Sequence, residues 1–347
     1  MQPINTTSKM KNLLLASLTL VITSNLFAQS DSSQLYFKKG MDEKNARRYL
    51  VASKFLEKAT QFDPSNIEAW MENGRVNLEM RRIDAAQANF LKAYELQPSN
   101  VAALRELTAL YFNNRQFQKA IDLGQKCNCS EGERIIGMSN YHLEDYGSAI
   151  KGLQRFLSKN PNDAEAAYTL GRSYLEIEDY RNAIAPYQKA VTLDPTRTSW
   201  MYELGLIFYN QNNFKDAVKY FKMADDGGYI KANDFYENAG FAYLSIGDVD
   251  NGMKYLNIIL KRKPNNKELL TNIAQAFYSA KKYKEALDFY QKLLENDPKD
   301  ARALYMAGIT FQKLGDKAKG QQMCDKAIEM EPALAKNRQK QEMPFGL

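Results

Sequence analysis

A proline recurs along the chain at an interval of 34 residues. The recurring prolines are Pro64, Pro98, Pro161, Pro195, Pro264, Pro298 and Pro332. Four of the intervals between them are 34 residues, and the gaps of 63 and 69 residues each accommodate one further unit of altered length. Nine units therefore fit between Ser33 and Leu334. Self-similarity at a fixed period indicates a repeat array, in which each unit packs on its neighbours, so a chain of 347 residues need not divide into separate globular cores.

Small residues return at two fixed offsets within these units. The first offset holds glycine in seven units: Gly40, Gly74, Gly137, Gly171, Gly205, Gly240 and Gly308. The second offset holds alanine or glycine in all nine: Ala52, Ala86, Ala120, Ala149, Ala183, Ala217, Gly252, Ala286 and Gly320. Because small side chains let two helices approach closely, we expect both sets to mark one helix contact in every unit.

The unit 164–197 shows the pattern of two short amphipathic helices. Small and apolar residues of the first helix share one helix face: Ala167, Leu170, Gly171 and Tyr174. Asp179 then has the position of an N-cap for the second helix, as Asp248 and Asp316 do in later units. Pro195 follows the second helix and prevents its continuation.

These features resemble the tetratricopeptide repeat, which has the same period and pattern. In the second unit the matching residues are Trp70, Gly74, Ala86, Phe90, Ala93 and Pro98. In the fifth unit they are Leu170, Gly171, Tyr174, Ala183, Tyr187, Ala190 and Pro195. The resemblance covers nearly all of the chain after residue 28. It implies an all-α fold, a right-handed α-solenoid of about nine helix-turn-helix repeats.

The expected repeats differ in length at two places. The units are 33–66, 67–100, 101–129, 130–163, 164–197, 198–231, 233–266, 267–300 and 301–334, with a C-terminal cap and tail at 335–347. Unit 101–129 lacks the proline and part of its second helix, and it has Gly124 where an aromatic residue is expected. Before residue 233, Asp225 to Gly228 replace a helix end. We expect both departures to change the rotation between repeats, and we expect Pro186 to bend the helix that contains it.

Residues 1–28 have the organisation of a signal peptide. Lys9 and Lys11 precede the apolar run Leu13 to Ile22, and Ala28 is a small residue at a plausible cleavage point. The junction before Gln29 resembles signal peptides of Bacteroidota. We therefore expect a protein exported by a Gram-negative bacterium, located in the periplasm or associated with the outer membrane, with only indirect membrane association. The alternative is that an uncleaved segment anchors the chain, although the run is short for a membrane span.

Composition argues against catalysis and against nucleic-acid binding. His142 is the single histidine, so multi-histidine metal sites are excluded, and any histidine-based triad would have to be built around that one imidazole. The net charge of +6 is spread over the chain, whereas a nucleic-acid partner requires a clustered basic face. We expect no enzyme activity, no cofactor, no metal and no small-molecule substrate.

The three cysteines fall into two groups. Cys127 and Cys129 lie at the end of the shortened unit 101–129, where either a local disulfide or two free thiols are compatible with the sequence. Cys324 occupies a core position of the last unit, so we expect a buried free thiol.

The resemblance implies a concave groove, lined by the first helix of each repeat, that holds an extended peptide or a partner helix. The groove-facing positions are the second, fifth, ninth, twelfth and thirteenth of each unit. The implied groove residues are Arg75, Arg105, Arg134, Tyr168, Arg172, Tyr202, Leu206, Tyr209, Phe241, Tyr278 and Tyr305. The arginines suit carboxylate groups of a partner. The alternative is that they are paired within the chain, since Glu79 and Glu176 each follow an arginine by four residues.

We therefore expect a non-enzymatic scaffold that binds protein or peptide partners in a cell-envelope or secretion-related complex. The alternatives are a membrane-anchored assembly factor and a regulatory subunit of an envelope enzyme. The lysine and asparagine set by which some family members clamp the carboxylates of chaperone tails is not found, which disfavours a chaperone adaptor.

Overall fold

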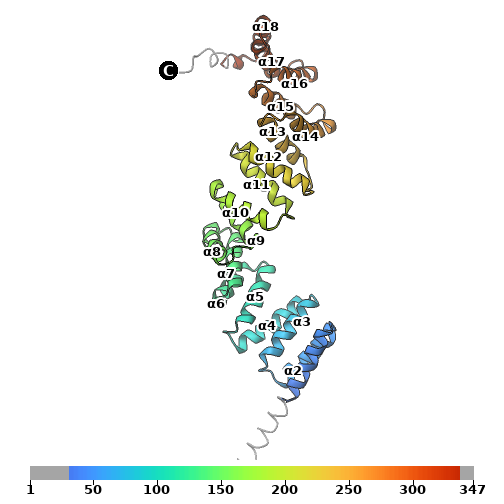
Figure 1. Ribbon diagram of the computed structural model, residues 1–347, viewed down its shortest axis with the longest axis vertical. Coiled ribbons are helices and arrows are strands. Elements are labelled where there is room, and N and C mark those ends of the chain that lie inside the picture. The colour runs from blue at the N-terminus through green and yellow to red at the C-terminus, as the bar shows by residue number, and fades with distance from the viewer. Residues whose placement is uncertain (1–30, 337–347) are drawn as a thin grey trace, which may run out of the picture. The chain divides into compact units, whose positions relative to one another are not determined.

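The computed structural model describes residues 31–336, and every regular element within them is helical (Figure 1). Residues 31–45 form the first helical segment. The following helices are α2 (Tyr49–Phe62), α3 (Ile67–Glu79), α4 (Ile83–Leu96), α5 (Val101–Asn113), α6 (Phe117–Cys127), α7 (Ser130–His142), α8 (Tyr146–Lys159), α9 (Ala164–Glu176), α10 (Tyr180–Leu193), α11 (Thr198–Asn210), α12 (Phe214–Asp226), α13 (Asn233–Ser245), α14 (Val249–Arg262), α15 (Lys267–Ser279), α16 (Tyr283–Asn296), α17 (Ala301–Lys313), α18 (Lys317–Met330) and the 3-10 helix η1 (Pro332–Leu334). This is the all-α helical-repeat fold that the sequence predicts.

Apart from α10, each helix from α2 to α18 packs chiefly on its neighbours along the chain, so the helices form consecutive hairpins. From α3 onward, each first helix of a hairpin begins at the first residue of one of the units defined above. Each recurring proline lies two residues beyond the end of a second helix, as Pro98 does after Leu96. Proline lacks the N–H that the next turn of helix would need, so it helps to stop these helices.

Side-chain caps fix where many of the helices begin. Asp179, Asp248 and Asp316 each accept a hydrogen bond from the backbone N–H three residues further on, which confirms their prediction as N-caps. First helices are capped in the same way by an asparagine or aspartate. These residues are Asn66, Asn100, Asp163, Asn266 and Asp300.

The chain divides into two compact units, residues 1–183 and 184–347, and the division falls within α10. In the described part of the first unit, Phe90, Leu107 and Ile135 belong to one buried cluster that α4, α5 and α7 share. In the second, Ile273 and Tyr290 lie in a cluster to which α13 to α17 contribute. Each unit therefore has buried clusters of its own to which several consecutive helices contribute, as expected for stacked repeats.

The recurring small residues lie where the two helices of a hairpin meet. A Cβ atom added at Gly74 would lie 2.4 Å from Cε1 of Phe90, on the other helix of the same hairpin. At Gly308 it would lie 2.8 Å from the carbonyl oxygen of Gly320. The prediction that these two offsets mark a helix contact is confirmed at both places.

Unit 101–129 is short because its second helix, α6, has 11 residues, whereas α4 and α8 have 14. Gly124 is buried there, and the segment between α12 and α13 contains Gly228 at a φ of +83°. Pro186 lies inside α10 as predicted. The altered rotation between repeats and the bend at Pro186 stay predictions.

Two expectations from the sequence fall outside residues 31–336. These are the signal peptide at 1–28 and nearly all of the cap and tail at 335–347, of which the structure describes 335 and 336 as helical. Among the residues that are described, no helix combines the length and the apolar character needed to cross a bilayer.

Candidate functional site

The four arginines predicted for the groove come from α3, α5, α7 and α9 of the first unit. Arg75 pairs with Glu72, and its Nε lies 3.3 Å from Oε1 of Glu106 on α5. Arg134 Nε lies 2.7 Å from Oδ2 of Asp163, the residue that caps α9. Each of these two arginines therefore joins its own repeat to the following one. Their role in binding a partner stays a prediction.

The partners of these arginines match the sequence expectation only in part. Arg172 lies 2.9 Å from Glu176, which confirms that pair. The expectation that Glu79 pairs with Arg75 is wrong, because Glu72 and Glu106 occupy the guanidinium instead. Arg105 has the weakest pairing of the four, at 4.0 Å from Glu106, and its side chain is 53% exposed.

Arg134 pairs with three acidic residues, Glu131, Asp163 and Glu165. Burial by itself lowers the pKa of a guanidinium, but the pKa of Arg134 is raised because Asp163, Glu131 and Glu165 outweigh that effect. Breaking one partner away would leave a partly buried charge, so this arginine is held firmly within the chain.

The predicted aromatic residues of the second unit differ in exposure. Tyr202 is buried and packs against Phe221, Tyr229 and Phe235. Its hydroxyl receives a hydrogen bond from Asn238 Nδ2 at 3.0 Å, and burial raises its pKa to about 12. Tyr202 therefore offers little surface to a partner.

The other predicted residues fall into the same two groups. Tyr305 is buried like Tyr202. The half-buried residues are Tyr168 in the first unit and Leu206, Tyr209, Phe241 and Tyr278 in the second.

A cavity of about 1200 Å³ opens among the last repeats of the second unit. The cavity lies between α15 and α17. The connection after α16 and the end of α18 also contribute to its lining. The lining residues are Lys267, Thr271, Gln275, Tyr290, Leu293, Asp297, Lys299, Asp300, Ala301, Arg302, Ala303, Tyr305, Met306, Met330, Glu331, Ala333 and Leu334. Of the predicted groove residues, the structure brings Tyr305 to this cavity.

The side chains of α15 that line the cavity form one row. Lys267, Thr271 and Gln275 are four residues apart, so they share a face of the helix. Sequence reasoning missed Thr271, Gln275 and Arg302 as candidates, although they occupy the fifth, ninth and second positions of their units. The groove-facing offsets alone identify all three residues.

Ion pairs surround the cavity. Lys267 Nζ lies 2.7 Å from Oδ2 of Asp300, and Arg302 Nη2 lies 3.2 Å from Oε1 of Glu331. Burial raises the pKa of Asp300, but the hydrogen bond from Lys267 and backbone N–H groups outweigh it, and the net pKa lies below its usual value. The carboxylate therefore stays ionised, and the rim of the cavity carries both signs of charge.

Tyr290 supplies the one buried hydroxyl of a cavity-lining residue that has no hydrogen-bond partner among residues 31–336. The side chain is 1% exposed, and burial raises its pKa to about 12, so the hydroxyl remains protonated. A buried polar group without a partner is costly, and such groups often mark a position that a ligand or water completes. Tyr290 is a residue of the cavity lining whose hydroxyl stays buried and without a partner among residues 31–336.

The substitution Tyr290→Phe is therefore expected to leave the free energy of unfolding of the isolated chain unchanged or to raise it by about 1 kcal/mol. The hydroxyl gives up its bonds to water on folding and gains none, so its removal relieves a penalty. Urea denaturation of both proteins measures the difference. A loss of stability of more than about 1 kcal/mol would show that the hydroxyl has a partner within the protein.

Comparison with known proteins gives a consistent family match. A family profile described as "Tetratricopeptide repeat" matches residues 71–127, 136–198, 168–229 and 238–301. A second profile with the same description matches residues 289–322. Together these matches cover more than half of the chain.

Two curated proteins are similar over shorter parts of their own length. The chain is 24% identical over 301 residues to "Protein CTR9 homolog" of Arabidopsis thaliana, a match that covers 82% of this chain and 28% of that protein. It is 26% identical over 174 residues to "DnaJ protein P58IPK homolog B" of Oryza sativa subsp. japonica, covering 44% and 37%. The match therefore spans 28% of the length of the first relative and 37% of the length of the second.

Solved structures with the same repeat are also similar. One is the C-terminal part of a TPR repeat-containing protein from Cytophaga hutchinsonii, 21% identical, covering 69% of this chain and all of that chain with a TM-score of 0.44. Another is YrrB, described as a TPR protein with an unusual peptide-binding site, 24% identical, covering 54% and 97% with a TM-score of 0.40.

Proposed function

Since the chain belongs to the tetratricopeptide repeat family, we propose that it is a scaffold that binds a peptide or partner helix in the cavity between α15 and α17. Tetratricopeptide repeats generally mediate protein–protein interaction, and their partners are proteins or peptides. The observation that carries the choice of site is the cavity of about 1200 Å³, whose lining includes Tyr290 and Tyr305.

The chemistry of the cavity suits a polypeptide. Leu293, Met306 and Leu334 give it an apolar wall, while Thr271 and Gln275 supply hydrogen-bonding groups along one side. A few placed polar groups on an otherwise apolar surface fix the orientation of a bound chain and thereby give specificity.

The setting of this interaction is the second part of the proposal. We place the protein in a cell-envelope or secretion-related complex of a Gram-negative bacterium, in the periplasm or at the outer membrane. The support for this setting is the sequence of residues 1–28, with Lys9 and Lys11 before an apolar run and a small residue at position 28.

Filling the cavity is expected to abolish partner capture without unfolding the chain. Gln275 is exposed at the cavity wall, so Gln275→Trp places a large ring there at little cost to the core. Crosslinking in the native host, followed by purification of the tagged full chain, measures which partners are retained. We expect the amount of each wild-type partner that co-purifies to fall by about tenfold or more. This corresponds to a loss of at least about 1.4 kcal/mol in binding free energy.

Gln291→Trp is the matched control, because Gln291 is also an exposed glutamine of the second unit and does not line the cavity. This variant should retain the wild-type partners. Equal retention of the same partners by both variants would contradict the assignment of the cavity as the binding site.

A further inference from the structure

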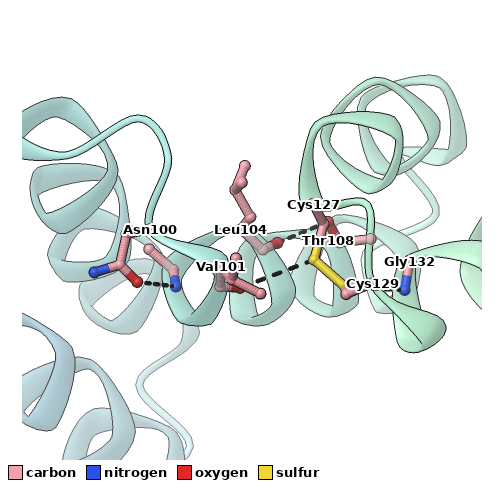
Figure 2. Close-up of a disulfide and its surroundings, with 8 residues drawn as sticks. Asn100, Val101, Leu104, Thr108, Cys127, Cys129 and Gly132 are labelled. Atoms are coloured by element: carbon pink, nitrogen blue, oxygen red, sulfur yellow. Dashed lines mark hydrogen bonds between the residues drawn. A yellow bond between two sulfur atoms is a disulfide. The ribbon is translucent and has the colours of Figure 1, made fainter.

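A disulfide joins the end of one repeat to the start of the next. Cys127 is the last residue of α6, Cys129 is the N-cap of α7, and the two sulfurs are bonded (Figure 2). Only Asn128 and Cys129 separate the two helices, and Asn128 adopts the left-handed conformation with a φ of +47°. The sequence is compatible with either a local disulfide or two free thiols at this place, and the structure has the disulfide.

The two sulfur atoms have different surroundings. Cys127 is 3% exposed, and its Sγ lies 3.9 Å from the carbonyl oxygen of Val101. Cys129 is half-buried and lines a cleft of about 650 Å³, to which Arg105 and Asn160 also contribute. Cys129 is therefore the more exposed residue of the pair, and we expect a thiol that approaches from solvent to attack its sulfur.

Cys129 also occupies a position that favours a thiolate after reduction. At most of the equivalent junctions the cap is an asparagine or aspartate oxygen, for example Asn100 and Asp163, whereas here Sγ of Cys129 accepts from the N–H of Gly132 at 3.4 Å. A thiolate at a helix N-terminus is stabilised by that N–H and by the helix dipole.

Two acidic residues in the first turn of α7 would oppose a thiolate, but both are paired. Glu131 lies 3.6 Å from Arg134, and Glu133 lies 2.8 Å from Lys159. Their negative charge is therefore partly compensated near Cys129.

The fold does not depend on this bond. A bridge between residues two apart closes a very short loop, so it constrains the unfolded chain far less than a long-range disulfide does. Helices α6 and α7 also pack directly, since a Cβ at Gly132 would lie 2.8 Å from the carbonyl oxygen of Gly124. We expect the reduced chain to stay folded.

We propose that Cys127 and Cys129 form a thiol–disulfide exchange site that reacts with a cysteine-containing peptide in the adjoining cleft. The thiolate of the peptide attacks Sγ of Cys129, which forms a mixed disulfide, and the electron pair of the broken bond leaves on Cys127. Cys127 takes up a proton, and its thiol then donates to the carbonyl of Val101. A second thiolate of the same peptide attacks the peptide sulfur of the mixed disulfide and releases Cys129 as a thiolate. The peptide loses two electrons and becomes a disulfide, and the pair of cysteines gains them.

The test uses the oxidised full chain and reduced glutathione, which is itself a peptide thiol. The chain is equilibrated anaerobically in buffers of graded glutathione ratio, quenched with acid and alkylated, and each cysteine is then quantified by peptide mass spectrometry. We expect the bond to open within the series and the mixed disulfide to form on Cys129, with circular dichroism unchanged. Cys324 is a buried cysteine and serves as an internal control that should stay unmodified.

Two variants separate the sulfurs. In Cys127→Ser the remaining thiol of Cys129 should react with oxidised glutathione about tenfold or more faster than the thiol of Cys127 does in Cys129→Ser. When a synthetic peptide with two reduced cysteines reacts with the wild-type chain, the peptide should be released in its disulfide form. One peptide should be oxidised for each protein chain. The proposal is overturned if the bond persists through the whole glutathione series, if the adduct forms on Cys127, or if the two variants react at equal rates.

Discussion

The variant Phe90→Ala is expected to lower the free energy of unfolding of this chain by about 3–5 kcal/mol, the largest effect among the substitutions considered. Phe90 is 0% exposed and packs in a cluster with Met71 and Leu107, which come from the helices on either side of α4. Its ring also lies over Gly74, which has no side chain to fill the space that the ring leaves. Alanine therefore removes a buried ring and creates a cavity, and both effects destabilise the folded chain.

Chemical denaturation followed by circular dichroism measures this loss. Phe62→Ala is a control of the same type, because Phe62 lies at the end of α2 and is 38% exposed. Its loss should be about 1 kcal/mol or less. Similar losses in the two variants would mean that Phe90 does not carry the packing between α3, α4 and α5.

The second large effect is expected where two backbones touch. In Gly308→Ala the new methyl group would lie 2.8 Å from the carbonyl oxygen of Gly320 and 3.0 Å from the backbone nitrogen of Cys324. Backbone atoms of α18 cannot move aside as a flexible side chain can, so the two helices must separate. We expect a loss of about 1–3 kcal/mol in the free energy of unfolding, although alanine is the better helix former.

The same substitution at Gly147 should raise the free energy of unfolding instead of lowering it. Gly147 is exposed in the first turn of α8, and the nearest atom to an added Cβ is Oδ1 of Asp145 at 3.8 Å. Gly147→Ala therefore gains up to about 1 kcal/mol from helix propensity alone. Thermal denaturation of the two variants measures both signs, and a stabilised Gly308→Ala chain would contradict the close approach of α17 and α18.

The boundaries of the helices could be predicted from the sequence because their causes are local and repeated. Asp248 caps α14 through a nitrogen three residues away, and Pro264 follows the end of that helix by two residues. Neither cause depends on the packing of the rest of the chain. Nine copies of the pattern then make the period visible even where one signal, such as the proline of unit 101–129, is missing.

The turns inside the hairpins show where such local signals are absent. A residue with positive φ occupies the same offset, the fifteenth position, in every unit. Gly247 and Gly315 suit that conformation, yet Arg81, Glu178 and Lys281 adopt it as well. Because the neighbouring helices impose this conformation, residue type does not reveal it.

The candidate site was less predictable than the fold, since it depends on contacts between repeats. Tyr202 and Tyr209 both occupy groove-facing offsets, but Tyr202 is covered by Tyr229 and Phe235, which follow it by about one repeat. Likewise, the partner of Arg75 on α5 is 31 residues away. A pattern within one unit cannot show which side chains of the next unit cover it.

The short link between α6 and α7 has a consequence for dividing the protein into fragments. Most second helices are followed by a four-residue connection such as 97–100, which leaves room for a cut between two intact hairpins. After Cys127 only two residues intervene, and Gly124 and Gly132 are in backbone contact across that link. A cut at residue 129 would strip α6 of a neighbour that it touches along its last turn. Fragments that end near Pro98 instead would keep whole hairpins, so that boundary suits recombinant dissection of the array.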